Sequence, residues 1–204
     1  MKIILLRSLL LLLIFGCARK KTSEPSRIEQ EGETTIQMQR LVDILIADSH
    51  LHTDIGPKLT EIEIKESEER LGLHLPASYR FFLKNFGNSA YWIYHQNVNE
   101  LETLSFLNEY PKNPRKTIEL EEEGRQIEVA SLLCLMTEDS NGGAWCWITS
   151  ENNDSGEWPL VYYNLSDRKL HYKLENFVKW LEILTECKHE VIRELDKAEK
   201  LNLG

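Results

Sequence analysis

The stretch LTEIEIKESEERLGLHLPASYRFFLKNFGNS, from Leu59 to Ser89, contains the start and stop signals of two consecutive helices. Thr60 can cap the first helix with its hydroxyl, and Glu63, three residues later, completes a capping box. Gly72 stands where a residue with left-handed backbone geometry commonly ends a helix. These signals predict a first helix that runs from about Thr60 to the residue before Gly72.

The second helix of the stretch has a wide apolar face. Pro76 has the ring-fixed φ that suits the first turn of a helix, and Gly87 ends the pattern. Between them, apolar side chains recur at i, i+3, i+4 and i+7, which places them on one face. We expect this face to be buried, together with residues from neighbouring segments: Tyr79, Phe82, Leu83 and Phe86, with Leu71, Leu75, Phe177 and Leu181.

At these residues the chain resembles the SUKH superfamily, also called the Smi/Knr-like family. In that family a helix ends in Leu-Gly, an apolar residue and Leu-Pro follow, and the next helix carries an aromatic residue and Phe-Leu before a glycine turn. The matching positions here are Leu71, Gly72, Leu75, Pro76, Tyr79, Phe82, Leu83 and Gly87. The family's Asn-Gly-Gly turn is replaced here by Gly87-Asn88-Ser89, which leaves the geometry of this turn open.

The resemblance covers roughly residues 36–186 and agrees with the pattern of predicted elements. Helices are expected near 37–47, 60–71, 76–86 and 175–199, and β-prone segments lie between them, with 101–110 open as helix or loop. One long strand is expected over 127–136. The fold class is therefore α+β, with helices at both ends flanking an antiparallel or mixed sheet.

The N-terminus resembles a bacterial lipoprotein signal. Lys2 and Arg7 precede a short apolar run that ends in Gly16 and Cys17, the arrangement of a lipobox. This implies cleavage after residue 16 and a diacylglyceryl group on Cys17, so that the protein is exported and anchored to the cell envelope. An ordinary cleaved signal or an uncleaved anchor would be the alternatives. Residues 17–35 are polar and predict a flexible tether, and 187–204 predict a helical extension after the domain.

The chain is acidic. Its formal net charge is −9, and it becomes −11 without residues 1–16, which contain Lys2 and Arg7 and no acidic residue. This charge argues against binding nucleic acid through phosphate neutralisation. An acidic surface could bind a basic protein surface, or the charge could serve solubility alone.

No catalytic or cofactor motif is present in the sequence. There is no nucleophile elbow and no glycine-rich phosphate loop. His50 and His52 resemble the His-x-His of metal-dependent amidohydrolases, but the segment before them has helical periodicity and too few residues follow for such a barrel. Cys134, Cys146 and Cys187 lack metal-ligand spacing and allow at most one disulfide among them. We therefore expect no enzyme activity, metal or cofactor.

Trp145 and Trp147 alternate with Cys146 and must share one face of a strand. They are therefore either buried together or exposed together. If exposed, they could form a binding surface for a protein partner, together with Trp158 and Asp139.

The resemblance implies an immunity protein that binds and neutralises a polymorphic toxin. The alternative is an envelope lipoprotein with a structural or regulatory role on the same scaffold.

Overall fold

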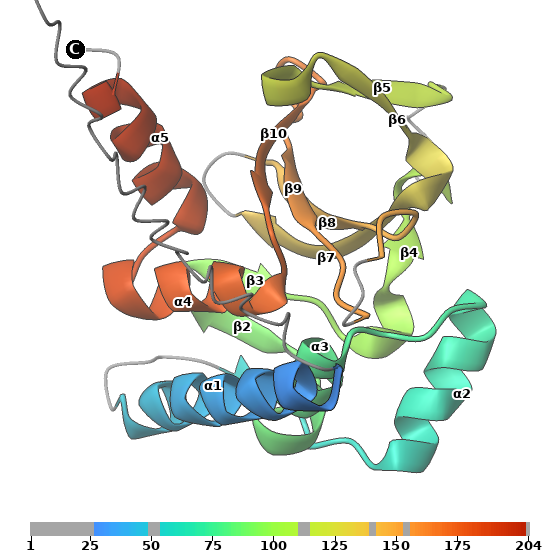
Figure 1. Ribbon diagram of the computed structural model, residues 1–204, viewed down its shortest axis with the longest axis vertical. Coiled ribbons are helices and arrows are strands. Elements are labelled where there is room, and N and C mark those ends of the chain that lie inside the picture. The colour runs from blue at the N-terminus through green and yellow to red at the C-terminus, as the bar shows by residue number, and fades with distance from the viewer. Residues whose placement is uncertain (1–26, 49–53, 110–114, 139–141, 153–155, 203–204) are drawn as a thin grey trace, which may run out of the picture.

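A computed structural model describes residues 27–48, 54–109, 115–138, 142–152 and 156–202 (Figure 1). Three helices come before the main strands and two come after them, which confirms the α+β class. The helices are α1 (Arg27–Ala47), α2 (Glu61–Leu71), α3 (Ala77–Asn85), α4 (Phe177–Cys187) and α5 (Val191–Asn202). Among the described residues no helix combines the length and apolar character needed to cross a membrane.

Within the described residues, ten strands form one mixed sheet in the order β1-β2-β3-β7-β8-β9-β10-β5-β6, with β4 paired to β7. The pairings between these strands are antiparallel except that of β10 with β5. The part from β7 to β6 curls over on itself, as Figure 1 shows. The strands are β1 (Asp54–Ile55), β2 (Ala90–Ile93), β3 (Gln96–Val98), β4 (Ser105–Phe106), β5 (Thr117–Leu120), β6 (Arg125–Glu128), β7 (Leu132–Glu138), β8 (Ala144–Ile148), β9 (Leu160–Tyr163) and β10 (Leu170–Leu174).

The central strands β7, β8 and β9 are buried on both faces, so their side chains alternate between two cores. On β8, Trp145 and Trp147 point toward the helices, whereas Cys146 and Ile148 point into the curl. The helix-side core also contains α1, α3 and α4, and the curl-side core contains β5, β6 and β10.

The start and stop signals of α2 are present as expected. Thr60 caps the helix through a complete capping box with Glu63, and Gly72 ends it with a φ of 70°. In α3, Tyr79, Phe82 and Leu83 are fully buried. Leu71 is only partly buried. The predicted burial is confirmed for the rest of the set, which is Leu75, Tyr79, Phe82, Leu83, Phe86, Phe177 and Leu181.

Two helix predictions were wrong in part. The first helix was expected over 37–47, but α1 already begins at Arg27, because a Glu- and Gln-containing segment extends the helix whose buried stripe starts at Met38. The final helix was expected to be continuous to about residue 199. Instead Lys188 adopts a left-handed φ of 53° and ends α4, so that α5 starts in a new direction.

The strand predicted over residues 127–136 is also divided. A short 3-10 helix, η4 (Val129–Ser131), separates β6 from β7. This break allows β6 to pair with β5 while β7 pairs with β8, and so it helps to close the curl.

The turn that departs from the family pattern is held by its neighbours. A Cβ at Gly87 would lie 2.5 Å from the carbonyl oxygen of Gly56, so this position requires glycine. The Asn88 amide accepts a hydrogen bond from Leu101 N (2.8 Å) and donates one to Glu102 (2.9 Å). Ser89 occupies a φ of 101°, a region that favours glycine, so the second glycine of the family turn is missing where the backbone still needs it.

Replacing Ser89 with glycine should therefore stabilise the protein by about 1 kcal/mol, because relief of the backbone strain exceeds the entropy that glycine adds to the unfolded chain. Urea unfolding measures the change. Ser89→Ala serves as the control, since it removes the hydroxyl but keeps the Cβ, and should give no gain. A less stable Ser89→Gly variant would contradict strain at this turn.

The N-terminus of α3 has no cap from its own segment, because Pro76 offers no side-chain hydrogen bond there. Glu157, from the loop before β9, supplies one instead. Its carboxylate accepts hydrogen bonds from Ser78 N (2.9 Å) and Ser78 Oγ (2.5 Å). Burial raises the pKa of Glu157 above its usual range, although both bonds from Ser78 oppose the shift.

Because the pKa of Glu157 is higher in the folded state than in the unfolded state, the protonated carboxyl stabilises the fold. This contribution to stability is fully present below the unfolded-state pKa and is lost as the pH rises through the folded-state pKa. Glutamine keeps an acceptor for Ser78 N and does not titrate. We therefore expect Glu157→Gln to become more stable relative to the wild type as the pH rises. The free energy of unfolding of the variant minus that of the wild type should increase from about pH 4 to about pH 7. Urea unfolding at both pH values measures this, and a difference that falls with pH would contradict it.

Candidate functional site

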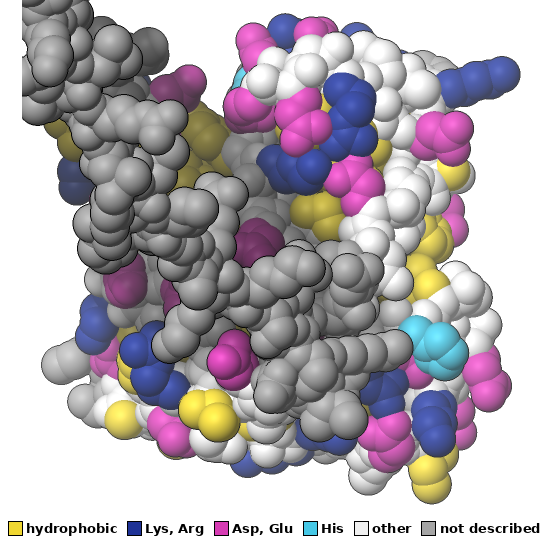
Figure 2. All heavy atoms as spheres, viewed as in Figure 1, with side chains coloured by type: hydrophobic (Ala, Val, Ile, Leu, Met, Phe, Trp, Pro, Cys, Tyr) yellow, Lys and Arg dark blue, Asp and Glu magenta, His cyan; other side chains and the backbone are white. Residues whose placement is uncertain are grey.

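A groove of about 560 Å³ lies between α5 and the rim of the curled sheet. Figure 2 shows the surface hollowed between these two parts of the molecule. Five carboxylates line the groove, and no lysine or arginine does so within the described part of the chain. The lining residues are Glu121, Glu122, Tyr162, Asn164, Ser166, Asp167, His171, Tyr172, Ile192, Asp196 and Glu199.

Three segments that are distant in sequence bring these side chains together. The short 3-10 helix η3 (Glu121–Glu123) follows β5 and ends at Gly124, whose φ is 58°. The β9–β10 turn is closed by hydrogen bonds between Asn164 and Lys169 (3.0 Å) and between Arg168 and Asn164 (2.9 Å). The third segment is α5, which is placed by its buried residues Val191 and Ile192.

Tyr172 links the rim to α5. Its hydroxyl lies 2.7 Å from Asp196 Oδ1 and 2.7 Å from Glu199 Oε2, and its backbone N donates to Glu122 (2.6 Å). Burial, with these two carboxylates, raises the pKa of Tyr172, so the phenol stays protonated. Because a phenol has one proton, it can donate to only one of the two carboxylates at a time. The cluster therefore has more acceptors than donors.

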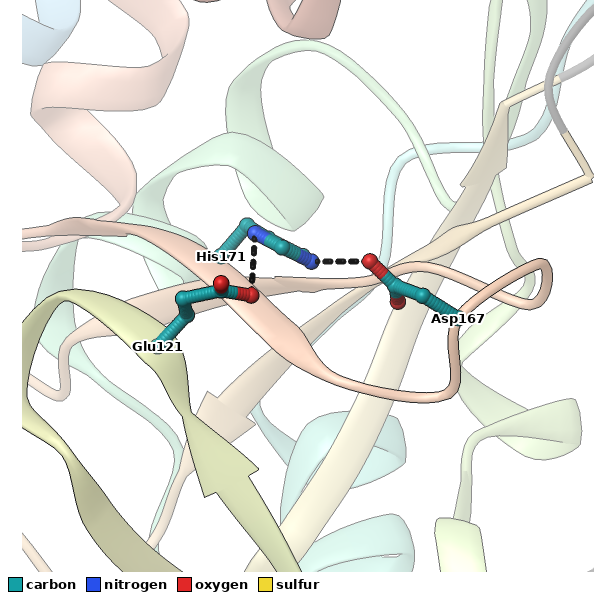
Figure 3. Close-up of side chains that lie close together, drawn as sticks. All are labelled: Glu121, Asp167 and His171. Atoms are coloured by element: carbon teal, nitrogen blue, oxygen red, sulfur yellow. Dashed lines mark hydrogen bonds and ion pairs between the residues drawn. The ribbon is translucent and has the colours of Figure 1, made fainter.

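A second cluster lies on the rim, where Glu121, Asp167 and His171 point toward one another (Figure 3). His171 Nε2 lies 2.8 Å from Asp167 Oδ2, and His171 Nδ1 lies 3.8 Å from Glu121 Oε2. Partial burial opposes ionisation of Asp167, but the hydrogen bond from Lys169 N and the contact with His171 outweigh it and lower its pKa.

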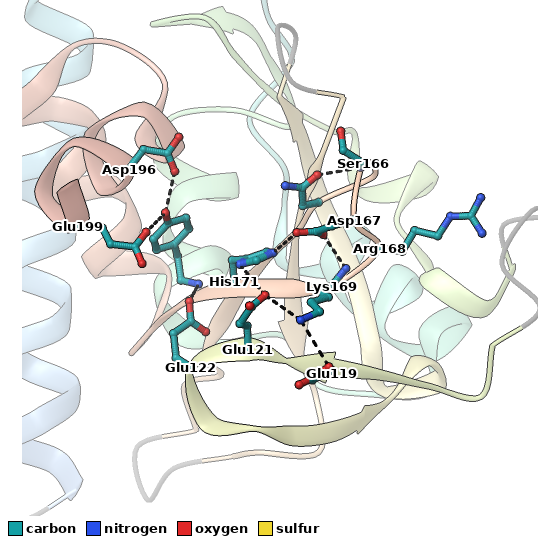
Figure 4. A network of polar contacts seen from close by, with 12 residues as sticks. Glu119, Glu121, Glu122, Ser166, Asp167, Arg168, Lys169, His171, Asp196 and Glu199 are labelled. Carbon is teal, nitrogen blue, oxygen red and sulfur yellow. Dashed lines mark hydrogen bonds and ion pairs between the residues drawn. The ribbon is translucent and has the colours of Figure 1, made fainter. Parts of the chain in front are cut away.

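Two carboxylates and an imidazole are ligand types that divalent metals accept, and their ligand atoms lie within 4.8 Å of one another. However, Lys169 Nζ already lies 3.2 Å from Glu121 Oε2 and 3.7 Å from Glu119 Oε2, as Figure 4 shows. The ammonium group thus neutralises part of the charge that a metal would need. The geometry fits an ion-pair network on the groove wall better than a metal centre.

Of the two alternatives for the tryptophans, core or exposed binding surface, the structure shows the core. Trp145 and Trp147 are 0% exposed and Trp158 is 5% exposed. Trp147 contacts Tyr79 edge-on at 4.8 Å and Trp158 at 5.9 Å between ring centroids. They are buried because β8 is covered by helices on that face. Asp139, His50, His52 and Cys17 lie outside the described residues.

The groove is not marked by any motif in the sequence. The acidic run Glu119–Glu123 has the composition of a solvated surface segment, and the acidic side chains of the last helix were not among the candidate site residues. The available signal was the i, i+3 spacing of Asp196 and Glu199 on a helix whose opposite face is apolar. That Tyr172 lies against this face depends on long-range packing.

The motif residues themselves lie outside the groove. Leu75, Tyr79, Phe82 and Leu83 belong to the helix-side core, and Gly72 ends α2. They stabilise the fold rather than line the candidate site.

No curated protein matches the chain. One family does, over residues 61–181: SUKH_6, described as SMI1-KNR4 cell-wall. This match spans more than half of the chain and includes both helices of the motif, the turn after them, and strands β2 to β10. The chain therefore belongs to the SUKH_6 family of SMI1-KNR4 domains.

Proposed function

We propose that this protein is an immunity protein that neutralises a cognate toxin by binding it directly, and that the acidic groove receives a basic segment of the toxin. SUKH domains are typically found in immunity proteins and are generally non-catalytic. The observation that carries the proposal is the deficit of hydrogen-bond donors where Tyr172 faces Asp196 and Glu199.

A lysine or arginine side chain would correct this deficit. It brings several N–H donors and a positive charge, and a guanidinium can bind two carboxylate oxygens at once. The groove places five carboxylates around such a group, and their field also accelerates the encounter with a basic partner.

The double variant Asp196→Asn/Glu199→Gln keeps the size of both side chains but removes their charge. We expect it to weaken binding to the co-purified toxin by about 10-fold or more, which is about 1.4 kcal/mol. Titration calorimetry at low and at moderate salt measures the affinity. The loss should shrink as salt rises, because screening already weakens the wild-type interaction.

The matched control is Glu66→Gln/Glu69→Gln, which neutralises two exposed carboxylates on α2. This pair changes the net charge equally but leaves the groove intact, so its affinity should stay close to that of the wild type. Equal losses in the two double variants would show a general charge effect and would contradict binding at the groove.

We further propose that the mature protein is lipid-anchored through Cys17 at the cell envelope. The support is the basic start, the short apolar run and the small residue before the cysteine. An exported immunity protein would act on a toxin at the envelope or during its entry. The alternative is an envelope lipoprotein with a structural or regulatory role, and it predicts no stoichiometric toxin partner after gentle extraction.

Cys17→Ser should abolish labelling by a clickable fatty acid and halt lipoprotein-type processing, because no thiol remains to take the diacylglyceryl group. The variant then lacks the acyl chains, which contribute about 0.8 kcal/mol of membrane binding per buried methylene. Thermal stability of the domain should not change, since Met38 is the first buried core side chain in the part of the chain that the structure describes. Equal labelling of the variant and the wild type, or a mature N-terminus elsewhere, would rule out lipidation at this cysteine.

A further inference from the structure

The curl-side core contains two cysteines that face each other across neighbouring strands. Cys134 on β7 is the register partner of Cys146 on β8, and their Sγ atoms lie 3.1 Å apart. They are 3% and 0% exposed, and both are free thiols in this structure.

We propose that Cys134 and Cys146 form a cross-strand disulfide when the chain folds in an oxidising compartment. This covalent link would join the two strands on which both cores depend. It does not rest on the immunity role or on the lipid anchor, because it follows from the geometry of the folded domain alone.

The strand geometry permits the bond. Directly opposite residues of an antiparallel pair have Cβ atoms about 4.5–5.5 Å apart, and disulfides need about 3.5–4.5 Å. The ladder shifts register between Cys134 and Met136, and such an irregularity increases the local twist and lets one strand adjust. From their present separation, the two sulfur atoms need to approach by about 1 Å.

The reaction is a thiol–disulfide exchange. The two thiols together lose two protons and two electrons and form one S–S bond, while a disulfide oxidant such as glutathione disulfide is reduced to two thiols. The first cysteine forms a mixed disulfide with half of the oxidant, and the second cysteine displaces that half as a thiolate.

This exchange should occur while the strands are still open. In the folded protein the hydrogen bond with Cys134, together with burial, raises the pKa of the Cys146 thiol, and a protonated thiol is a poor nucleophile. The surrounding side chains, among them Leu132, Ile148 and Val161, also exclude a water-borne oxidant. The state reached during folding is therefore retained afterwards.

Cys187 provides an internal control. It lies at the end of α4, outside the curl, and its Sγ lies 3.2 Å from the carbonyl oxygen of His189. Burial raises the pKa of this thiol as well, so a low reactivity does not distinguish Cys134 and Cys146 from Cys187. What distinguishes the pair is that its two residues face each other on neighbouring strands.

The test uses the full chain with Cys17→Ser, which leaves three thiols. The protein is unfolded, then refolded in a glutathione redox buffer or in dithiothreitol, and its thiols are counted with a maleimide under denaturing conditions. We expect one reactive thiol after the first treatment and three after the second. Peptide mapping should join the segments of Cys134 and Cys146, and the midpoint of thermal unfolding should rise by about 5–10 °C.

Two variants complete the test. Cys187→Ala should lose the remaining thiol and keep the thermal shift. Cys134→Ala should lose the thermal shift and retain two thiols. Circular dichroism checks that this variant folds, and Cys146→Ala is used instead if Cys134→Ala does not fold. Three thiols after oxidative refolding, a stable glutathione adduct, or a disulfide that includes Cys187 would each overturn the proposal.

Discussion

The structure depends on the burial of β7, β8 and β9 on both faces. Each of these strands presents one row of side chains to the helices and the other row to the curl, so both cores are lost if the strands separate. A fully buried large apolar side chain contributes roughly 1.5–3 kcal/mol, and Trp145, Trp147 and Leu160 on one face are matched by Cys146, Ile148 and Val161 on the other. The helices cover one face, and the return of β10 to β5 and β6 covers the other.

The local features of the fold could be predicted from the sequence, and the features that depend on distant contacts could not. The capping box of α2, the end of this helix at Gly72 and the buried stripe of α3 follow from signals within a few residues. The break at Lys188 does not, because this residue has no side-chain preference for a positive φ and is placed there by the packing of α4 and α5.

The same distinction applies to the candidate site. The spacing of Trp145 and Trp147 predicted that they share a face but could not say whether that face is covered, because the cover comes from α3 and α4. The groove is formed by η3, the β9–β10 turn and α5. The parallel pairing of β10 with β5, beside the groove, joins segments about 50 residues apart in the sequence. Such a site emerges only when the sheet order is known.

Family membership explains the scaffold, whereas function depends on what is built on its surface. In this chain the motif residues lie in the core, and the acidic side chains lie on the rim and on α5, where they can differ without disturbing either core. That separation suits a protein whose partner must be recognised specifically, because charges on the groove can change while the packed strands remain the same.

Binding of a toxin at the groove beside α5, as proposed above, can be tested by amide hydrogen exchange of the protein with and without its co-purified partner, because exchange reports local protection along the whole chain. We expect new protection in η3, in the turn from Asn164 to Lys169 and in α5, with α2 unchanged. Protection confined to α2 or to the β1–β2 edge, with none at the groove, would contradict it.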